Sequence, residues 1–316
     1  MRGSQADGEG QGRVLRIATR GSALALRQTE WVADRLRAAW SGARVELVSA
    51  STAGDRDKQT PLTSLGQGVF VKGVEELLLV GAADIAVHSL KDVPTLLTAS
   101  LELAAFPPRE DPRDGLVCRV GRDLRSLPPR ARVGTGSPRR AAQLLQLRQD
   151  LRILPVRGNL DTRLRKLRNG EFEALVLAVA GLARLGRQDE LDQIFEIEEC
   201  TPAVGQGALV IQTRTDDHAT RELVAPLDDR HCRAESLAER AFLAALGGGC
   251  QLPAGALARV ADRHLQIVGV AAAPDGRELV RAHHSGNASD AATVGHRLAE
   301  LLLPRAQGLL SLAARA

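Results

Sequence analysis

Short apolar runs alternate with amphipathic segments over the first third of the chain. Strand-like apolar runs cover residues 14–19, 44–50 and 83–87, and apolar residues at helical spacing cover 23–39 and 70–80. This order of strand, helix, strand, helix, strand is typical of a parallel sheet that is covered by helices. We therefore expect an α/β domain with a parallel sheet in this part of the chain.

The middle of the chain repeats the same order of elements. We expect strands over 131–133, 152–156 and 174–179, and helices over 138–149 and 159–169. These segments predict a second α/β domain.

The pattern changes again after residue 228. A helix is expected over 232–246, three strand-like segments over 255–260, 264–272 and 277–283, and a last helix over 290–303. This order predicts a small α+β domain at the end of the chain.

The fold class that follows is α/β, with two α/β domains plus a smaller C-terminal α+β domain. The strand-like run 209–213 is expected to return the chain to the first domain, so that two crossing segments form a hinge between the first two domains. The expected boundaries are a disordered leader over 1–12, a first domain over 13–107 and 208–225, a second domain over 108–207 and a C-terminal domain over 226–316. The long polar segment 51–69 is expected to form a mobile lid.

Composition and charge exclude several classes of protein. Nothing in the sequence resembles the apolar core of a signal peptide or a membrane span, so we expect a cytoplasmic protein with no membrane partner. The net charge is +4, and arginine supplies nearly all of the positive charge. Aromatic residues make up only 2% of the chain and tyrosine is absent, which argues against a single-stranded nucleic-acid binder because stacking platforms are missing.

Polar side chains follow the apolar run 83–87. His88, Lys91 and Asp92 come where the strand gives way to a loop, and Pro94 prevents the strand from continuing. Ligands bind beyond the carboxyl ends of strands in open α/β sheets, so Lys91 and Asp92 are candidate site residues. The alternative is a surface turn with a chance pair of charges, and for His88 we favour a hydrogen-bonded structural role.

Arginines gather where strands end and helices begin. Two arginines in the first turn of a helix oppose its dipole, which makes a bound anion the simplest compensation, although the side chains can also extend into water. The candidate anion-binding residues are Arg20, Ser22, Ser137, Arg139, Arg140, Arg157, Asn159, Arg163 and Arg184. We expect a ligand with several carboxylates or phosphates in an interdomain cleft. There is no P-loop and no dinucleotide-binding glycine motif, so a nucleotide is not supported.

Cys250 follows three consecutive glycines. A thiol on such a loop has little packing around it, so it is a candidate nucleophile or attachment point, the alternative being an incidental surface cysteine. The other cysteines are Cys118, Cys200 and Cys232, and no two of the four have the spacing of a zinc site. We expect no metal.

These residues resemble the porphobilinogen deaminase family, whose members are also called hydroxymethylbilane synthases. The resemblance extends over almost the whole chain from about Val14. The stretches that carry it are 16–22, 84–94, 109–114, 133–140, 157–159, 177–182, 202–208 and 247–253. The chain departs from the family in two places. The segment 66–69 lacks the basic residue that many members have there. Residues 136–138 read Gly-Ser-Pro, where members often have Ser-Ser-Leu.

The resemblance implies a fold whose first two domains are similar to periplasmic binding proteins. It also implies a dipyrromethane cofactor joined by a thioether to Cys250, and the condensation of four porphobilinogen molecules with loss of ammonia, followed by hydrolytic release of hydroxymethylbilane. Asp92 would stabilise pyrrole cations and assist the loss of ammonia. Its neighbour Lys91 is, from the residues alone, either an anion-binding residue or a charge partner. The arginines, together with Ser22, Ser137, Asn159 and Gln206, would hold the cofactor and the substrate carboxylates.

The same resemblance implies a monomer with porphobilinogen as its small-molecule partner, no nucleic acid and no membrane, and a transient hand-over of product to the next enzyme. The rival hypothesis is a non-enzymatic polyanion-binding protein on the same two-domain scaffold. The glycine-rich Cys250 loop in an additional domain argues against that rival.

Overall fold

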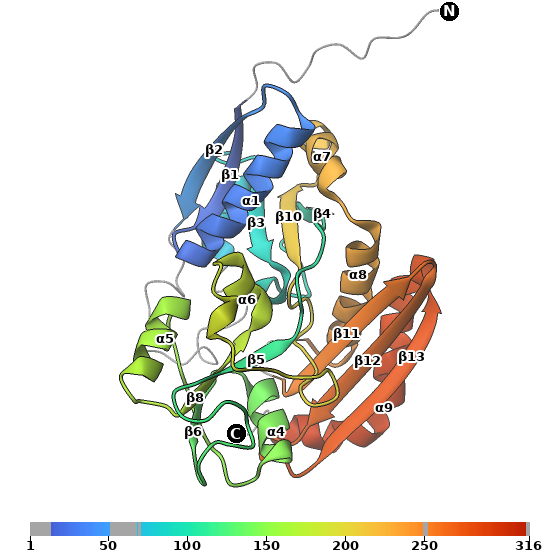
Figure 1. Ribbon diagram of the computed structural model, residues 1–316. Coiled ribbons are helices and arrows are strands. Elements are labelled where there is room, and N and C mark those ends of the chain that lie inside the picture. Colours follow the sequence, from blue (N-terminus) through green and yellow to red (C-terminus); the bar gives the residue numbers. More distant parts are fainter. Residues whose placement is uncertain (1–13, 51–67, 69–70, 249–251, 314–316) are drawn as a thin grey trace, which may run out of the picture.

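The computed structural model describes residues 14–50, 68, 71–248 and 252–313, with side chains up to residue 310 (Figure 1). The expected leader over 1–12 and nearly all of the expected lid over 51–69 lie outside the described residues. The strands described form three sheets, one in each of the two α/β units and one in the C-terminal unit.

The first sheet has the strand order β2-β1-β3-β10-β4. Its strands are β1 (Val14–Arg20), β2 (Arg44–Ala50), β3 (Ile85–Ser89), β4 (Leu101–Ala105) and β10 (Leu209–Arg214). β1 runs parallel to β2 and β3, whereas β10 is antiparallel to both β3 and β4. The expected parallel arrangement of the first three strands is therefore confirmed, and β10 and β4 add an antiparallel part to the sheet. The chain re-enters at the carboxyl end of β3, where Leu209 pairs with Ser89, and must run back along it.

Helices cover both faces of the first sheet. The residues of β1 alternate, so that Ile17 packs with α1 (Ala23–Ala39) and Ala18 packs with α3 (Lys72–Leu79). A short helix α7 (His218–Val224) adds to the α1 side. The first two helices were expected from the sequence, whereas β4 and α7 were not.

The second sheet has the order β7-β6-β8-β5-β9. Its strands are β5 (Asp114–Cys118), β6 (Arg132–Gly134), β7 (Arg152–Leu154), β8 (Ala174–Ala178) and β9 (Gln193–Ile194). Three strands are parallel, and β5 is antiparallel to β8 and β9. The two sheets therefore share one arrangement, in which three parallel strands are followed by an antiparallel pair.

Three helices belong to the second sheet. They are α4 (Pro138–Leu147), α5 (Leu160–Arg168) and α6 (Val179–Arg184). Ser137 and Asn159 cap α4 and α5, since each side-chain oxygen accepts a hydrogen bond from a backbone N–H three residues later. Leu144 of α4 and Leu164 of α5 pack into separate apolar clusters.

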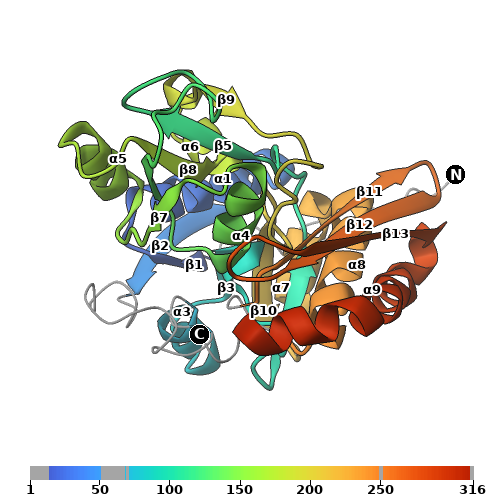
Figure 2. The same cartoon turned by 90° about the horizontal axis from the view of Figure 1, so that it is seen from below.

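The C-terminal unit consists of one antiparallel sheet and two long helices (Figure 2). The helix α8 (Arg230–Ala245) precedes the strands β11 (Ala254–Ala261), β12 (His264–Ala272) and β13 (Leu279–Asn287), and α9 (Ala291–Ala313) follows them. The two helices pack side by side against one face of the sheet.

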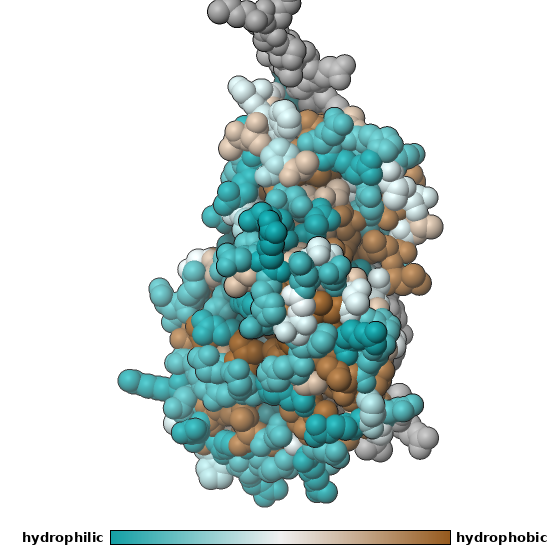
Figure 3. Space-filling model, turned by 90° about the vertical axis from the view of Figure 1, so that its right-hand side faces the viewer, coloured by the Kyte–Doolittle hydropathy of each residue, from teal (hydrophilic) through white to brown (hydrophobic). Residues whose placement is uncertain are grey.

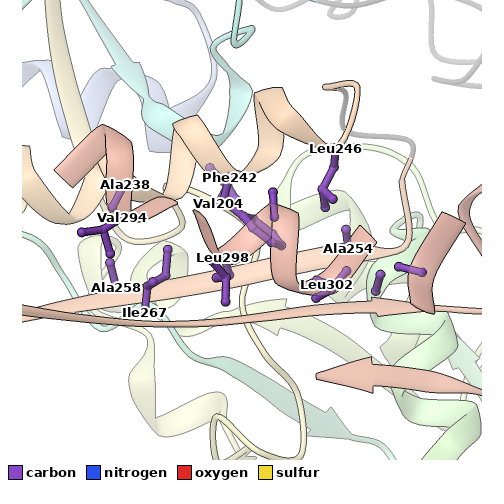
Figure 4. Close-up of a cluster of buried hydrophobic side chains, with 14 of the residues drawn as sticks. Val204, Ala238, Phe242, Leu246, Ala254, Ala258, Ile267, Val294, Leu298 and Leu302 are labelled. Carbon is purple, nitrogen blue, oxygen red and sulfur yellow. The ribbon is translucent and has the colours of Figure 1, made fainter. Parts of the chain in front are cut away.

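One cluster of apolar side chains forms the core of this unit. Phe242 of α8, Leu298 and Leu302 of α9 and Ile267 of β12 converge in it (Figure 4). We expected the last helix to end at residue 303, before Pro304, but the structure continues it by ten residues. Its apolar face continues past the proline with Ala306 and Leu309, both buried in the same cluster, and this burial offsets the missing N–H.

The surface carries mostly polar side chains, with scattered apolar residues between them on the face drawn in Figure 3. Among the described helices, none has the length and apolar character needed to cross a membrane.

Candidate active site

A cavity of about 850 Å³ lies between the first and second sheets. Its lining comes from the carboxyl ends of β1, β2 and β8, from the first turns of α1 and α5, and from a 3₁₀ turn, η1 (Leu90–Asp92), that follows β3. This is where ligands bind in open α/β sheets. The described residues that line it are Arg20, Gly21, Ser22, Leu24, Ser49, Ala50, Lys91, Asp92, Arg140, Arg157, Gly158, Asn159, Leu160, Thr162, Arg163, Arg165, Leu177, Ala178 and Gly181.

Positive charge dominates this lining. Among the described residues that line the cavity, Asp92 is the only carboxylate. The cations are Arg20, Lys91, Arg140, Arg157, Arg163 and Arg165. Converging guanidinium groups are suited to carboxylates or phosphates, which they bind with two parallel hydrogen bonds. Sequence reasoning missed Arg165, because residues two apart on a helix do not normally share a face.

The crossing segment that leads into β10 supports the turn that carries Asp92. Leu90, the first residue of η1, is buried, and its N–H donates to the carbonyl of Ala208 at 3.0 Å. Gly205 has a φ of +71°, and a Cβ at this position would lie 2.8 Å from Cγ of Leu90. A glycine is therefore needed for the close approach of this segment to η1.

Two of the predicted arginine groups line the cavity at helix starts. Ser22 caps α1 by accepting from the N–H of Ala25 at 3.3 Å, beside Arg20. At the start of α5, Arg163 donates through Nε to the carbonyl of Gly158 at 2.8 Å. Burial and the nearby charge of Arg140 lower the pKa of Arg163 to about 10. This side chain therefore remains charged at neutral pH.

The arginine pair on α4 has a protein carboxylate as its partner. Arg140 donates to Oδ1 of Asp114 at 2.9 Å from Nε and 2.6 Å from Nη2, and Nη1 of Arg139 lies 2.7 Å from Oδ2. Asp114 has no exposed surface, and the two arginines hold the pKa of its carboxyl well below the usual range, against the opposing effect of burial. Sequence reasoning missed Asp114, although an aspartate that opens an apolar strand is a signal for a buried charge.

Only one of these two arginines lines the cavity. Arg140 does so, whereas Arg139 extends toward the C-terminal unit and donates to the carbonyl of Thr201 at 2.6 Å. A Cβ at Gly255 of β11 would lie 2.8 Å from Cδ of Arg139. Arg139 therefore packs between the second sheet and the third.

Gln206 lies behind the cavity and is not part of its lining. Its amide oxygen accepts from Nζ of Lys91 at 3.3 Å, and its amide nitrogen donates to Oδ1 of Asp114 at 2.8 Å and to the carbonyl of Pro112 at 2.7 Å. Burial lowers the pKa of Lys91 to about 8, and the charge of Arg140 adds to this effect.

Two other predicted residues also lie outside the lining. Ser137 caps α4 by accepting from the N–H of Arg140 at 3.4 Å. Arg184 donates through Nη2 to the carbonyl of Gly207 at 2.6 Å, and burial lowers its pKa to about 10. Both therefore support elements around the cavity.

His88 of β3 is buried in a polar network on the face of the first sheet that α3 covers. Its Nε2 lies 3.0 Å from Oε1 of Gln212, whose Nε2 donates to Glu75 at 2.8 Å. Since the bond to Glu75 fixes the orientation of the amide, Nε2 of His88 carries the proton. Burial lowers the pKa of His88, as is typical of a neutral structural histidine.

Cys250 lies outside the described residues, between Gly248 and Leu252. A Cβ at Gly248 would lie 2.9 Å from Oγ1 of Thr95. A small cavity of about 30 Å³, lined by Asp92 and Leu243 among others, lies at this end of α8. Gly248, the last described residue before Cys250, is therefore close to the segment that follows Asp92. The described residues contain no cluster of histidine, cysteine and acidic side chains that could hold a metal.

Two solved structures have a limited similarity to this chain. An arginine-specific periplasmic binding protein from Salmonella typhimurium is similar at a TM-score of 0.40 and 16% identity, covering 68% of this chain and 91% of that chain. A nutrient-binding protein from Burkholderia cenocepacia, bound to methionine, is similar at a TM-score of 0.42 and 14% identity, covering 66% of this chain and 90% of that chain.

Sequence relatives are much closer. The chain is 48% identical over 297 residues to a porphobilinogen deaminase from Pelotomaculum thermopropionicum, with 94% of this chain and 95% of the relative covered. It is 49% identical over 290 residues to one from Roseiflexus castenholzii, with 92% and 95% covered. Residues 15–222 match the dipyrromethane cofactor binding domain of porphobilinogen deaminase, and 233–304 match its C-terminal domain. The chain belongs to the porphobilinogen deaminase family.

Proposed function

We propose that the chain condenses four porphobilinogen molecules head to tail at this cavity, with Asp92 as the catalytic carboxylate. Each condensation releases ammonia, and hydrolysis then releases the linear tetrapyrrole hydroxymethylbilane. The observation that carries this assignment is that, among the described residues lining the cavity, one is a carboxylate and all the other charged ones are cations. Each pyrrole of the substrate brings an acetate and a propionate, so a growing chain needs many positive partners and one acid at the reacting position.

The lining is chemically suited to a dipyrromethane, which carries four carboxylates. Residues that would hold it are Arg20, Ser22, Arg140, Arg157, Asn159 and Arg163. When bound, the group supplies the nucleophilic pyrrole carbon to which the first substrate is joined. Ser137, Arg139, Arg184 and Gln206 would act from behind the lining, by holding α4 and the crossing segments in place.

Asp92 and Lys91 would have different roles, although they are adjacent. The carboxylate of Asp92 would accept a hydrogen bond from a pyrrole N–H and stabilise the positive charge that develops as ammonia leaves. The ammonium of Lys91 would hold a substrate carboxylate, because it points toward Gln206 and Arg140 in a positive environment. A lysine with a pKa of about 8 is mostly charged at neutral pH, which suits an anion-binding role better than that of a base.

Cys250 is the proposed attachment point. The three described cysteines are free, and burial raises the pKa of Cys118 and Cys200 to about 12 and that of Cys232 to about 11. Few of these thiols are ionised at neutral pH, so they are poor nucleophiles. The remaining cysteine, Cys250, follows in the sequence soon after Gly248, which faces Thr95.

The mass of the intact protein tests the attachment. We expect the purified chain to be heavier than its sequence by one dipyrromethane, and Cys250→Ser to remove the additional mass. Cys118→Ser is the matched control and should keep it. A wild-type chain that turns over porphobilinogen without additional mass would refute the attachment.

Asp92→Asn tests the catalytic assignment. The amide preserves shape but cannot stabilise a developing cation, so we expect turnover to fall by about 10²–10⁴-fold at unchanged melting temperature. Turnover within threefold of wild type would show that another group is the catalytic acid. Under the rival hypothesis of a non-enzymatic polyanion-binding protein, wild-type chain would bind porphobilinogen without releasing ammonia.

We also propose the domain boundaries given by the sequence pattern, with the first domain over 13–107 and 208–225, the second over 108–207 and the third over 226–316. The chain passes from the first sheet to the second near 106–113 and returns near 195–208, which supports these boundaries. Limited proteolysis that cuts first inside one of these units would argue against them. We also propose a cytoplasmic monomer that hands its product over transiently to the next enzyme. Sedimentation of the loaded enzyme tests the monomeric state.

A further inference from the structure

A buried arginine on α8 binds the segment that directly follows the catalytic turn. Arg240 is 8% exposed. Its Nη1 donates to the carbonyl of Val93 at 3.1 Å, and its Nη2 donates to the carbonyls of Pro94 at 2.7 Å and Thr95 at 3.2 Å. One guanidinium therefore holds three consecutive carbonyl groups, starting at the residue next to Asp92.

This arginine differs from the other buried arginines near the site. Arg109 and Arg140 pair with buried carboxylates, whereas Arg240 makes no ion pair with a residue that the structure describes. Burial alone accounts for the lowered pKa of Arg240. If this contact only held α8 against the first domain, an apolar side chain could fill the same space without the cost of burying a charge.

The segment 93–95 is a meeting point of three parts of the molecule. Pro94 faces the described residue of the expected lid, since a Cβ at Gly68 would lie 3.1 Å from its Cγ. Thr95 faces Gly248, where the Cys250 loop begins. Arg240 and Leu243 of α8 line the small cavity together with Asp92. The same helix therefore contacts the catalytic segment and continues into the loop of the attachment cysteine.

We propose that Arg240 is a positioning residue that fixes Asp92 relative to the end of α8, from which the chain continues toward Cys250. By holding the carbonyls of 93–95, it makes η1 and the end of α8 one rigid unit. Asp92 then keeps its position relative to α8 during the reaction. The inference rests on the proposed roles of Asp92 and Cys250, and it adds a function to the contact between the first and C-terminal domains.

Arg233 provides a matched control on the same helix. It lies about two turns earlier, and its Nη2 donates to the carbonyl of Ala104 in the first domain at 2.7 Å. Its contact with the Ala104 carbonyl is of the same chemical kind, but Ala104 belongs to β4 and not to the catalytic segment. Unlike Arg240, Arg233 also pairs through Nε with Asp228 at 2.8 Å. If Arg240 only docks two domains, substitutions at the two positions should have the same consequences.

The experiment compares Arg240→Met, Arg240→Lys and Arg233→Met in the cofactor-loaded full chain. Intact mass gives the loaded fraction, and kcat and KM are expressed per loaded molecule. For Arg240→Met we expect kcat to fall about 10- to 100-fold with KM within threefold, because the substrate carboxylates are held elsewhere and only the reacting geometry is disturbed. Arg233→Met should keep kcat within threefold at a similar loss of melting temperature.

Hydrogen exchange supplies a readout that does not depend on turnover. Amides of the peptide 90–98 should exchange at least tenfold faster in Arg240→Met and stay protected in Arg233→Met. Arg240→Lys, which retains a donor, should recover part of both effects, and it decides the question if Arg240→Met does not fold.

Two results would overturn the proposal. One is a kcat for Arg240→Met that equals that of Arg233→Met or, if Arg240→Met does not fold, a kcat for Arg240→Lys that equals it. The other is unchanged exchange in 90–98. Either result leaves the catalytic assignment intact as long as Asp92→Asn abolishes turnover, whereas an active Asp92→Asn enzyme would refute the proposed function itself.

Discussion

The amide oxygen of Gln206 lies 3.3 Å from the ammonium of Lys91, so that one glutamine connects the catalytic turn to the second sheet. The other end of the same amide donates to Asp114, the carboxylate that Arg140 also contacts. Lys91 belongs to the first sheet's side of the cavity, and Asp114 opens a strand of the second sheet. Gln206 is therefore placed to keep the two sides in register.

Substitution of Gln206 should impair substrate binding. In Gln206→Met, Lys91 loses an acceptor and Asp114 loses a donor, so we expect KM for porphobilinogen to rise at least threefold. Stability should fall by about 1–3 kcal/mol, since a buried carboxylate and a carbonyl lose a partner. Steady-state kinetics and denaturant unfolding measure the two effects.

Gln143 provides the control for this substitution. Like Gln206 it is 1% exposed, and its amide donates to the carbonyl of Thr201 and accepts from the N–H of the same residue. Gln143→Met should lose similar stability while KM stays unchanged. An equal rise of KM in both variants would mean that Gln206 has no specific effect on Lys91.

The pH dependence of KM should report the charge of Lys91. Its pKa of about 8 reflects burial and the charges of Arg140 and Arg139, opposed by Asp92 and Asp114. The ammonium is charged below pH 8 and neutral above it, so an anion held by Lys91 is released as pH rises. We expect KM to increase several-fold between pH 7 and pH 9 in wild type.

Lys91→Arg isolates this contribution. Arginine stays charged over the whole range, so KM of the variant should be nearly flat between pH 7 and pH 9. Ionisation of the substrate is common to both enzymes and cancels in the comparison. Parallel profiles would show that the charge of Lys91 is not the titrating feature.

Gly205→Ala should disturb the catalytic turn. The backbone strain of a positive φ costs about 1 kcal/mol, and the added Cβ would meet Leu90, the residue before Lys91. Gly186 is the control: its φ is +65°, and a Cβ there would have no neighbour within 4 Å. Gly186→Ala therefore introduces the backbone strain without a steric contact. We expect both to lose stability, but only Gly205→Ala to lose turnover, by at least tenfold. Equal activities would show that Leu90 adjusts without moving Asp92.

Asp114→Asn should change the response to acid. The folded pKa of Asp114 is depressed, so its carboxylate contributes stability above the unfolded pKa of about 3.9, and this contribution is lost as pH falls below that value. At pH 7 the variant should be less stable by about 3–5 kcal/mol, because two buried arginines lose their partner. The difference should shrink as the pH is lowered. Unfolding curves at several pH values that run parallel would contradict a charged Asp114.

Local signals in the sequence were sufficient for much of the scaffold. The helices expected over 23–39, 138–149 and 159–169 begin where predicted, and Ser22, Ser137 and Asn159 cap them through backbone N–H groups only three residues away. The bounds of α1 and β2 agree with expectation for the same reason. The strands β4 and β5 were missed, because each is five residues long and flanks a proline-rich segment that dominated the local pattern.

Contacts between distant residues could not be predicted in the same way. The sequence singled out Arg139 and Arg140 as equals, but only the packing of Asp114 and Thr201 decides that one lines the cavity and the other turns away. Gln206 was expected to hold the cofactor, and its observed partners come from both α/β units. Such partners depend on how the units assemble, which no local rule contains.

The order β2-β1-β3-β10-β4 has a consequence for how the chain reaches its native state. β10 lies between β3 and β4, yet the ribosome makes it after every strand of the second sheet. Domains generally fold as units during synthesis, and pairings between distant segments form slowly. The second domain should therefore resist protease in chains that are truncated near residue 205 and released from the ribosome, while residues 14–105 remain cleavable. In this protein the N-terminal part of the sequence would be the later one to fold, which leaves the catalytic turn unformed until residues beyond 214 have emerged.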